Sequence, residues 1–182
     1  MKKLALMLLV ISFGAKAFEY KLAGGLLLNN HEVDTNDGYK EEMDYSFQLG
    51  AIAYHELQTN LKFRSGLLYT RKDFKGELSG IDYELTFSYL TIPATIQYQI
   101  DNAPLSLIGG LNAQIKLSDD CEVDTGTCSV QDPESLVTPL VFGAAMDFNQ
   151  KFSGEFTYEY PLGDTAKKTE TSSFVFNILY KL

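Results

Sequence analysis

The segment Ser172-Ser-Phe-Val-Phe-Asn-Ile-Leu-Tyr-Lys-Leu182, at the end of the printed sequence, decides the fold class. Bulky apolar side chains occupy every second position: Phe174, Phe176, Ile178, Tyr180 and Leu182. The positions between them carry Ser173, Val175, Asn177, Leu179 and Lys181. An alternation with a period of two predicts an amphipathic β-strand that has one strongly apolar face.

The same alternation recurs along the chain and predicts eight strands. They cover residues 18–29, 43–55, 61–74, 82–100, 104–117, 136–148, 151–162 and 172–182. The connections alternate in length. Those after the second, fourth and sixth segments are short, whereas polar loops are expected at 30–42, 75–81, 118–135 and 163–171. Short turns on one side and long loops on the other are typical of an up-and-down barrel in the outer membrane.

The fourth segment breaks the pattern. Tyr83, Leu85 and Phe87 occupy odd positions, whereas the apolar residues from Leu90 onward occupy even ones. We expect a one-residue bulge near 88–90 to return all of them to a single outward face. Pro93 lacks a backbone donor, so it predicts a local distortion of the same strand.

The first 17 residues have the pattern of a cleaved signal peptide. Lys2 and Lys3 precede a short apolar run, and Ala15-Lys16-Ala17 supplies the small residues of a cleavage site. The run is too short to favour the alternative, a retained anchor helix that crosses the bilayer. Cleavage leaves one domain, residues 18–182, with 12 basic and 24 acidic residues and a formal charge of −12. Such acidity argues against nucleic acid as a partner.

Alternation does not show which face points outward, because a soluble lipid-binding barrel is apolar inside. Three features favour a transmembrane barrel. The strand pattern continues to the last residue, the polar face of 136–148 holds small residues that suit a narrow lumen, and aromatic residues collect toward strand ends as interfacial girdles do. The girdle expected at the periplasmic rim holds Tyr20, Phe63, Tyr98, Phe148, Phe152 and Tyr180. The girdle expected at the outer rim holds Tyr45, Tyr69, Phe87, Tyr158, Tyr160 and Phe174.

The predicted fold is therefore all-β: an eight-stranded antiparallel up-and-down barrel in a bacterial outer membrane, with both termini in the periplasm. The interior of such a barrel is only wide enough to be filled by side chains. Inward charges of both signs nearly balance, and we expect a lumen charge network of Lys21, Lys62, Arg64, Lys116, Asp147, Glu155, Glu159 and Lys181. Because unpaired buried charges are costly, the network predicts a plug. The alternative is a gate in which the pairs exchange partners.

Cys121 and Cys128 are the only cysteines, and they lie in a polar segment. Export implies an oxidising compartment, so we expect a disulfide between them. The pair has no histidine nearby and is a poor zinc site. Neither a cofactor nor a metal is expected.

Short motifs add a family resemblance. They are Tyr89-Leu-Thr-Ile-Pro93, Gly109-Gly110, Phe142-Gly-Ala144, Phe156-Thr-Tyr-Glu-Tyr160, Leu162-Gly-Asp164 and Phe174 to Tyr180. With them the chain resembles the small barrels of the OmpA/OmpX type and, more closely, the porin-like outer membrane protein β-barrel family that includes PorT. The resemblance implies a fold and a location rather than one chemistry. It also implies that the last strand is the signal for the barrel-assembly machinery, although Leu182 stands where phenylalanine is usual.

The favoured function is a non-enzymatic, monomeric barrel that supports envelope integrity or presents loops, surrounded by outer-membrane lipid and lipopolysaccharide. Its acidic loops admit divalent-cation bridging, but their spacing matches no calcium-binding loop. The alternative is a small diffusion channel or a conduit for hydrophobic ligands. An enzyme that modifies outer-leaflet lipid would need a base beside a nucleophile. Only His31 and His55 are available, and the sequence fixes no partner for either.

Overall fold

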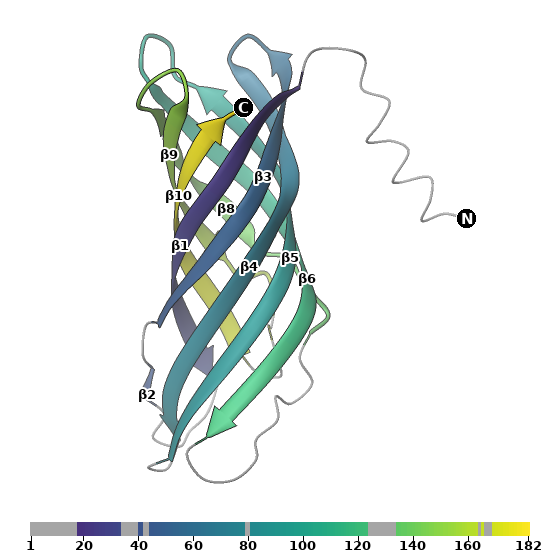
Figure 1. Cartoon of the computed structure of the whole chain (residues 1–182), viewed down its shortest axis with the longest axis vertical. Coiled ribbons are helices and arrows are strands. Elements are labelled where there is room, and N and C mark those ends of the chain that lie inside the picture. Colours follow the sequence, from purple (N-terminus) through teal and green to yellow (C-terminus); the bar gives the residue numbers. More distant parts are fainter. Residues whose placement is uncertain are drawn as a thin grey trace, which may run out of the picture.

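Long antiparallel strands form a closed barrel in the computed structural model of the chain (Figure 1). The structure describes residues 18–33, 40–41, 44–78, 81–123, 134–163, 165 and 169–182. The predicted signal peptide, residues 1–17, lies outside these ranges and stays a prediction. Within the described ranges, no helix is long and apolar enough to cross a membrane.

The strands follow the predicted alternation. They are β1 (Glu19–Val33), β2 (Lys40–Glu41), β3 (Asp44–Gln58), β4 (Leu61–Leu78), β5 (Ile81–Gln99), β6 (Leu105–Val123), β7 (Leu136–Val137), β8 (Leu140–Asp147), β9 (Phe152–Tyr160) and β10 (Thr169–Lys181). Each of the eight predicted segments is a strand, and β7 and β8 together occupy the predicted segment 136–148. The all-β prediction is confirmed.

The eight long strands close into a barrel through pairing between neighbours. Each long strand pairs with the next one along the chain, and β10 returns to pair with β1, where Leu22 faces Tyr180. Every pairing is antiparallel, which is the up-and-down order that the alternating loops predicted. Closure removes the unpaired edges that an open sheet would expose in lipid.

The barrel has two different ends. One end, called the turn end here, carries the three short connections 59–60, 100–104 and 148–151, the start of β1 and the C-terminus (Figure 1). At the other end, called the extension end, β4, β5 and β6 continue as paired antiparallel strands. The β4–β5 ladder reaches Leu78 and Ile81, and the β5–β6 ladder reaches Tyr83 and Val123.

The prediction of a loop at 75–81 is wrong, because most of these residues belong to strands at the extension end. Residues 75–78 pair with 81–84, and an ion pair of 3.8 Å joins Lys75 to Glu84 across the two strands. The expected loops at 30–42 and 118–135 are likewise shorter, because β1 runs to Val33 and β6 to Val123. Backbone pairing continues where the apolar alternation stops, since strands in water need no lipid-facing side chains.

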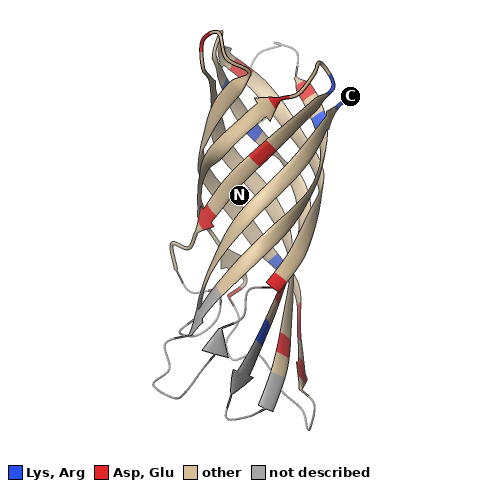
Figure 2. Cartoon of the chain, turned by 90° about the vertical axis from the view of Figure 1, so that its left-hand side faces the viewer, with Lys and Arg blue, Asp and Glu red and all other residues tan. Residues whose placement is uncertain are grey.

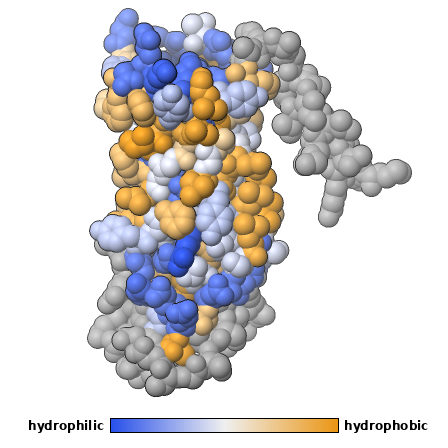
Figure 3. All heavy atoms as spheres, in the orientation of Figure 1, coloured by the Kyte–Doolittle hydropathy of each residue, from blue (hydrophilic) through white to orange (hydrophobic). Residues whose placement is uncertain are grey.

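The outward face is apolar and the inward face is mostly polar, as expected for a membrane barrel. Orange apolar side chains cover the upper and middle part of the surface in Figure 3, and hydrophilic residues gather at both ends. Outward side chains with large exposed fractions include Leu22, Leu26, Leu49, Leu67, Leu107, Leu111, Phe142, Phe156, Phe176 and Ile178. Eleven of the twelve predicted girdle aromatics occupy outward positions, the exception being Phe87.

Two predictions about β5 are wrong: the outward position of Phe87 and the bulge near 88–90. The β4–β5 register holds without a shift, so β5 keeps one alternation and Phe87 and Tyr89 point inward, 2% and 1% exposed. The bulge lies in β6 instead. Ser88 pairs with Ser118 and Tyr89 with Lys116, which leaves Leu117 as the extra residue. The phase break in the sequence reflected apolar residues that fill the barrel interior, rather than residues that face lipid.

The predicted distortion at Pro93 is confirmed. The β4–β5 ladder has no paired residues between the pair Ser65 and Ala94 and the pair Leu68 and Thr91. Proline cannot donate a hydrogen bond to the ladder, so the pairing lapses beside it.

Candidate functional site

The lumen is the candidate site, because the polar side chains of all the long strands converge there. Charged residues stand singly along the middle of the strands and gather around the turn end (Figure 2). The predicted charge network occupies three separate places along the lumen, and only Lys116 lies outside its central part.

Glu19 organises the turn end. Its carboxylate lies 3.1 Å from Lys181, 3.5 Å from Lys62 and 3.6 Å from Lys21. Lys21 also approaches Asp147 at 3.7 Å and donates a hydrogen bond of 3.1 Å to Ser153 Oγ. The group therefore ties the start of β1 to β4 and to the end of β10.

Arg64 and Glu155 form the first fully buried pair. Arg64 Nη2 lies 2.6 Å from Glu155 Oε1, and Arg64 Nη1 donates to Thr95 Oγ1 at 3.4 Å. The Tyr54 hydroxyl donates to the same carboxylate at 3.3 Å, and its ring lies 5.4 Å from the guanidinium carbon. The pair joins β4 to β9 across the lumen.

A second buried pair, Lys72 with Glu159, lies nearer the extension end at 2.8 Å. Asn112 and Gln114 donate to the same carboxylate at 2.7 and 3.0 Å. The predicted network omitted Lys72. The alternation in β4 could have identified it. Arg64, Thr70 and Lys72 all occupy even-numbered positions, which point inward.

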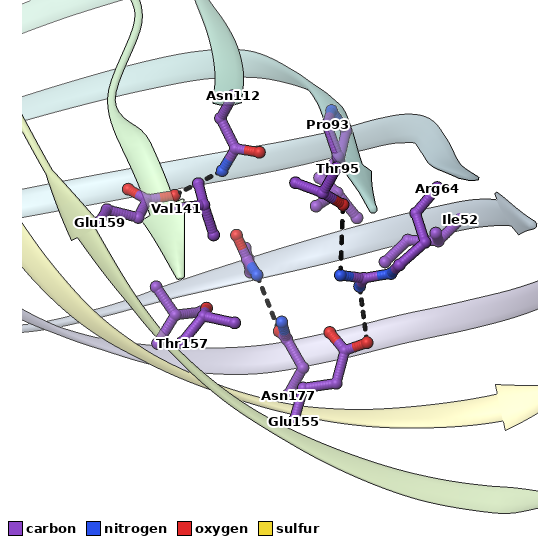
Figure 4. Close-up of a pocket in the computed structure, with 13 residues that line it drawn as sticks. Ile52, Arg64, Pro93, Thr95, Asn112, Val141, Glu155, Thr157, Glu159 and Asn177 are labelled. Carbon is purple, nitrogen blue, oxygen red and sulfur yellow. Dashed lines mark hydrogen bonds and ion pairs between the residues drawn. The ribbon is translucent and has the colours of Figure 1, made fainter. Parts of the chain in front are cut away.

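Uncharged polar side chains fill the space between the pairs. Gln48 donates to Asn177 at 2.7 Å, and the hydroxyls of Thr70 and Thr91 lie 2.9 Å apart. A cavity of about 30 Å³ remains beside them (Figure 4). The lumen is therefore packed and hydrogen-bonded, with a small void near its middle.

An apolar layer covers the second pair on the extension side. Phe74, Phe87, Tyr89 and Val137 form a buried cluster, with Leu85 packed against it. The rings of Phe74 and Phe87 are 5.9 Å apart, and those of Phe87 and Tyr89 are 6.2 Å apart. Sequence reasoning missed this layer because it placed Phe87 on the lipid side.

The remaining predicted residues lie outside the central lumen. Lys116 pairs with Asp119 at 2.6 Å across the β6 bulge. Cys121 lies near the end of β6, whereas Cys128 lies outside the described residues, so their disulfide stays a prediction. The predicted assembly signal lies at the C-terminal end of the barrel. Its members on the outward face of β10 are Phe174, Phe176, Ile178 and Tyr180, and Leu182 comes directly after the strand. No group of three metal-binding side chains occurs in the part of the chain that the structure describes.

Comparison with solved structures gives the same fold at low sequence identity. The attachment invasion locus protein Ail of Yersinia pestis, in complex with the heparin analogue sucrose octasulfate, is 16% identical, with a TM-score of 0.56. Neisserial surface protein A is 15% identical, with a TM-score of 0.57. Each alignment covers 92% of this chain and 100% of the other. A search of curated proteins gives no match.

The family comparison is more specific. The model of the family described as "Outer membrane protein beta-barrel domain" matches residues 12–167, which is most of the sequence. This match agrees with the apolar outer face, the polar lumen and the closed ladder. The chain therefore belongs to the outer membrane protein β-barrel family.

Proposed function

We propose that the protein is a non-enzymatic, non-conducting barrel that stabilises the envelope and presents its extension end to a partner. The main observation behind this proposal is that two buried ion pairs, Arg64–Glu155 and Lys72–Glu159, cross the lumen. Arg64, Lys72, Glu155 and Glu159 are 2–4% exposed, and each cation has its carboxylate within 2.8 Å. Side chains packed in this way leave no continuous water path through an eight-stranded barrel.

Planar bilayers test the absence of conduction. We expect no stable channel steps from the folded protein in concentrated potassium chloride. The variants Glu159→Gln and Arg64→Gln should lower barrel stability and still open no pore, because the remaining side chains keep their volume. A large rise in single-channel conductance in either variant would contradict the plug and favour a gate.

We also propose that the extension end faces outside the cell and that both termini are periplasmic. Short periplasmic turns and longer extracellular segments are usual in such barrels, and the turn end of this chain carries the short connections. A membrane-impermeant maleimide provides the test. Lys75→Cys, on exposed β4, should be labelled in intact cells, and Lys151→Cys only after the outer membrane is broken. The unsubstituted protein sets the baseline for the two native cysteines. The reverse pattern would invert the orientation.

The charge of the extension end indicates what it could contact. The acidic residues there whose side chains the structure describes are Asp44, Asp73, Glu84, Asp119, Asp120, Glu122 and Glu134, and the basic ones, apart from the buried Lys72, are Arg71, Lys75 and Lys116. This excess of negative charge disfavours a polysulfated ligand such as the one bound to Ail and favours a basic partner. Retention of the refolded protein on immobilised heparin at physiological salt would count against this choice. Divalent-cation bridging to lipopolysaccharide stays a prediction for the loops.

The outer-membrane lipid and the barrel-assembly machinery are the remaining proposed partners of a monomeric barrel. The apolar outward face supports the first. The outward side chains of β10 from Phe174 to Tyr180 support the second, because they form an unbroken apolar row. If that row is the assembly signal, Leu182→Phe should speed insertion by purified assembly machinery, and Phe176→Ser should slow it. Equal insertion rates for all three proteins would remove the assignment.

A hydrophobic-ligand conduit or small channel is the second candidate. Two features support it: the lapse of the β4–β5 ladder at Pro93, and the apolar layer inside the barrel at the extension end. Both features lie next to buried ion pairs rather than along an open path, which is why we favour the plug. The conductance measurement separates the two functions.

A further inference from the structure

The cavity in the middle of the lumen has the size and the wall of a water site. Its volume is about 30 Å³, and one buried water needs about 10–15 Å³ of such space. There is therefore room for about two molecules. The wall combines polar side chains, among them Gln48, Thr95 and Asn112, with apolar ones such as Ile52 and Val141. Figure 4 shows the polar groups on strands from opposite sides of the barrel.

Several polar groups of this wall have hydrogen-bonding capacity left over. Arg64 Nε is buried and has no hydrogen-bond partner among the described residues. Asn112 uses its amide nitrogen toward Glu159, and Asn177 uses its amide oxygen toward Gln48 (Figure 4). The other half of each carboxamide can still accept or donate a bond. Buried polar groups are nearly always satisfied, and ordered water is the usual partner where protein atoms are missing.

The local charge favours water over an ion. Arg64 and Lys72 carry two positive charges, and Glu155 and Glu159 carry two negative ones, so the two pairs cancel. A metal ion or a chloride would be left with no net counter-charge in a region of low dielectric constant. A neutral molecule with two donors and two acceptors matches the mixed wall.

Buried side chains lie on both sides of the cavity along the barrel. On the extension side lies the buried layer of Phe74, Phe87, Tyr89 and Val137. On the turn side lies Tyr54, which is 3% exposed and hydrogen-bonded to Glu155. We expect these layers to slow the exchange of water in the cavity with bulk solvent.

We propose that the lumen binds two long-lived water molecules, which hydrogen-bond to the Arg64–Glu155 pair and to the amides of Asn112 and Asn177. The inference rests on the proposed closed lumen, because an open channel would exchange its water freely. The waters complete the hydrogen bonding of the plug. They also hydrate the middle of the lumen, although the barrel conducts no ions or solutes.

Oxygen-17 magnetic relaxation dispersion of the refolded mature barrel in micelles counts such waters. A matched pair of variants isolates the cavity. Val141→Leu adds one methylene group to its wall, and Val137→Leu makes the same change in the apolar layer, which does not line it. We expect Val141→Leu to lower the count by about one relative to the unsubstituted protein, because a methylene group has about the volume of one water molecule, and Val137→Leu to leave it unchanged. An unchanged count in Val141→Leu, or an equal loss in both variants, overturns the proposal.

The unsubstituted protein gives a second readout that needs no variant to fold. Water-selective NMR should show cross-peaks from water to the backbone amides of Thr95 and Thr157 at mid-barrel. Their absence overturns the water site. Conductance, measured separately, tests the closed lumen itself. A silent barrel without these cross-peaks defeats only the water site, whereas steady conduction defeats the proposed function first.

Discussion

Glu159 is the residue whose substitution should cost the barrel most. Its carboxylate accepts from Lys72 at 2.8 Å, from Asn112 at 2.7 Å and from Gln114 at 3.0 Å, and the residue is 2% exposed. Glu159→Gln keeps the shape but removes the negative charge. It also replaces one acceptor oxygen with a donor group that faces other donors. Lys72, itself 3% exposed, is then left as a buried charge without its counter-ion.

Breaking a buried pair by removing one partner costs about 3–5 kcal/mol, chiefly because the other charge stays buried. That is roughly two to four powers of ten in the unfolding equilibrium constant. The double variant Glu159→Gln, Lys72→Met should recover most of this loss. It strands no charge, and replacement of both partners by groups of similar volume is often close to neutral.

Urea unfolding of the barrel in lipid vesicles measures these free energies, with the folded fraction read from the mobility of unheated samples on SDS gels. The reasoning is refuted if the single variant loses less than about 1 kcal/mol, the range of solvent-exposed pairs. It is equally refuted if the double variant is no more stable than the single one.

Other positions should respond in graded ways in the same assay. Glu19→Gln should lower the free energy of unfolding by no more than about 1 kcal/mol, because two of its three lysine partners, Lys62 and Lys181, are exposed to solvent and screened; a loss as large as that of Glu159→Gln would contradict this. Leu67→Lys, in the middle of the lipid face, should cost about 2–4 kcal/mol and Tyr45→Lys, at the rim, about 0–1 kcal/mol; equal costs would argue against the position of the membrane. Gly66→Ala should destabilise the barrel, because the new Cβ would lie 2.2 Å from the Ala51 carbonyl oxygen, whereas Gly24→Ala, with nothing within 4 Å, should be nearly silent.

The sequence was sufficient to predict the strands, their order and their closure, because lipid on one side imposes a strict period of two. It was insufficient where that constraint ends. Residues 75–78 continue β4 beyond the apolar belt, and the glycine and the two charged residues among them resemble a loop in the sequence. The apolar run around Phe87 was attributed to lipid, although the barrel interior buries it.

The pairing of charges inside the lumen could not be predicted for a different reason. Arg64 meets Glu155, and Lys72 meets Glu159, across the barrel from β4 to β9, strands that are not neighbours in the sheet. Which residues meet there depends on the tilt and stagger of all eight strands together. Periodicity gives the inward direction of each side chain but not its height in the lumen.

Single-channel recording of the refolded barrel in planar bilayers is the most direct test of a closed lumen, on protein shown to be folded by a heat-dependent shift on SDS gels. We expect a shifted, folded band and no stable conductance steps. Steady steps from a preparation that shows the folded band would contradict a lumen closed by its own side chains.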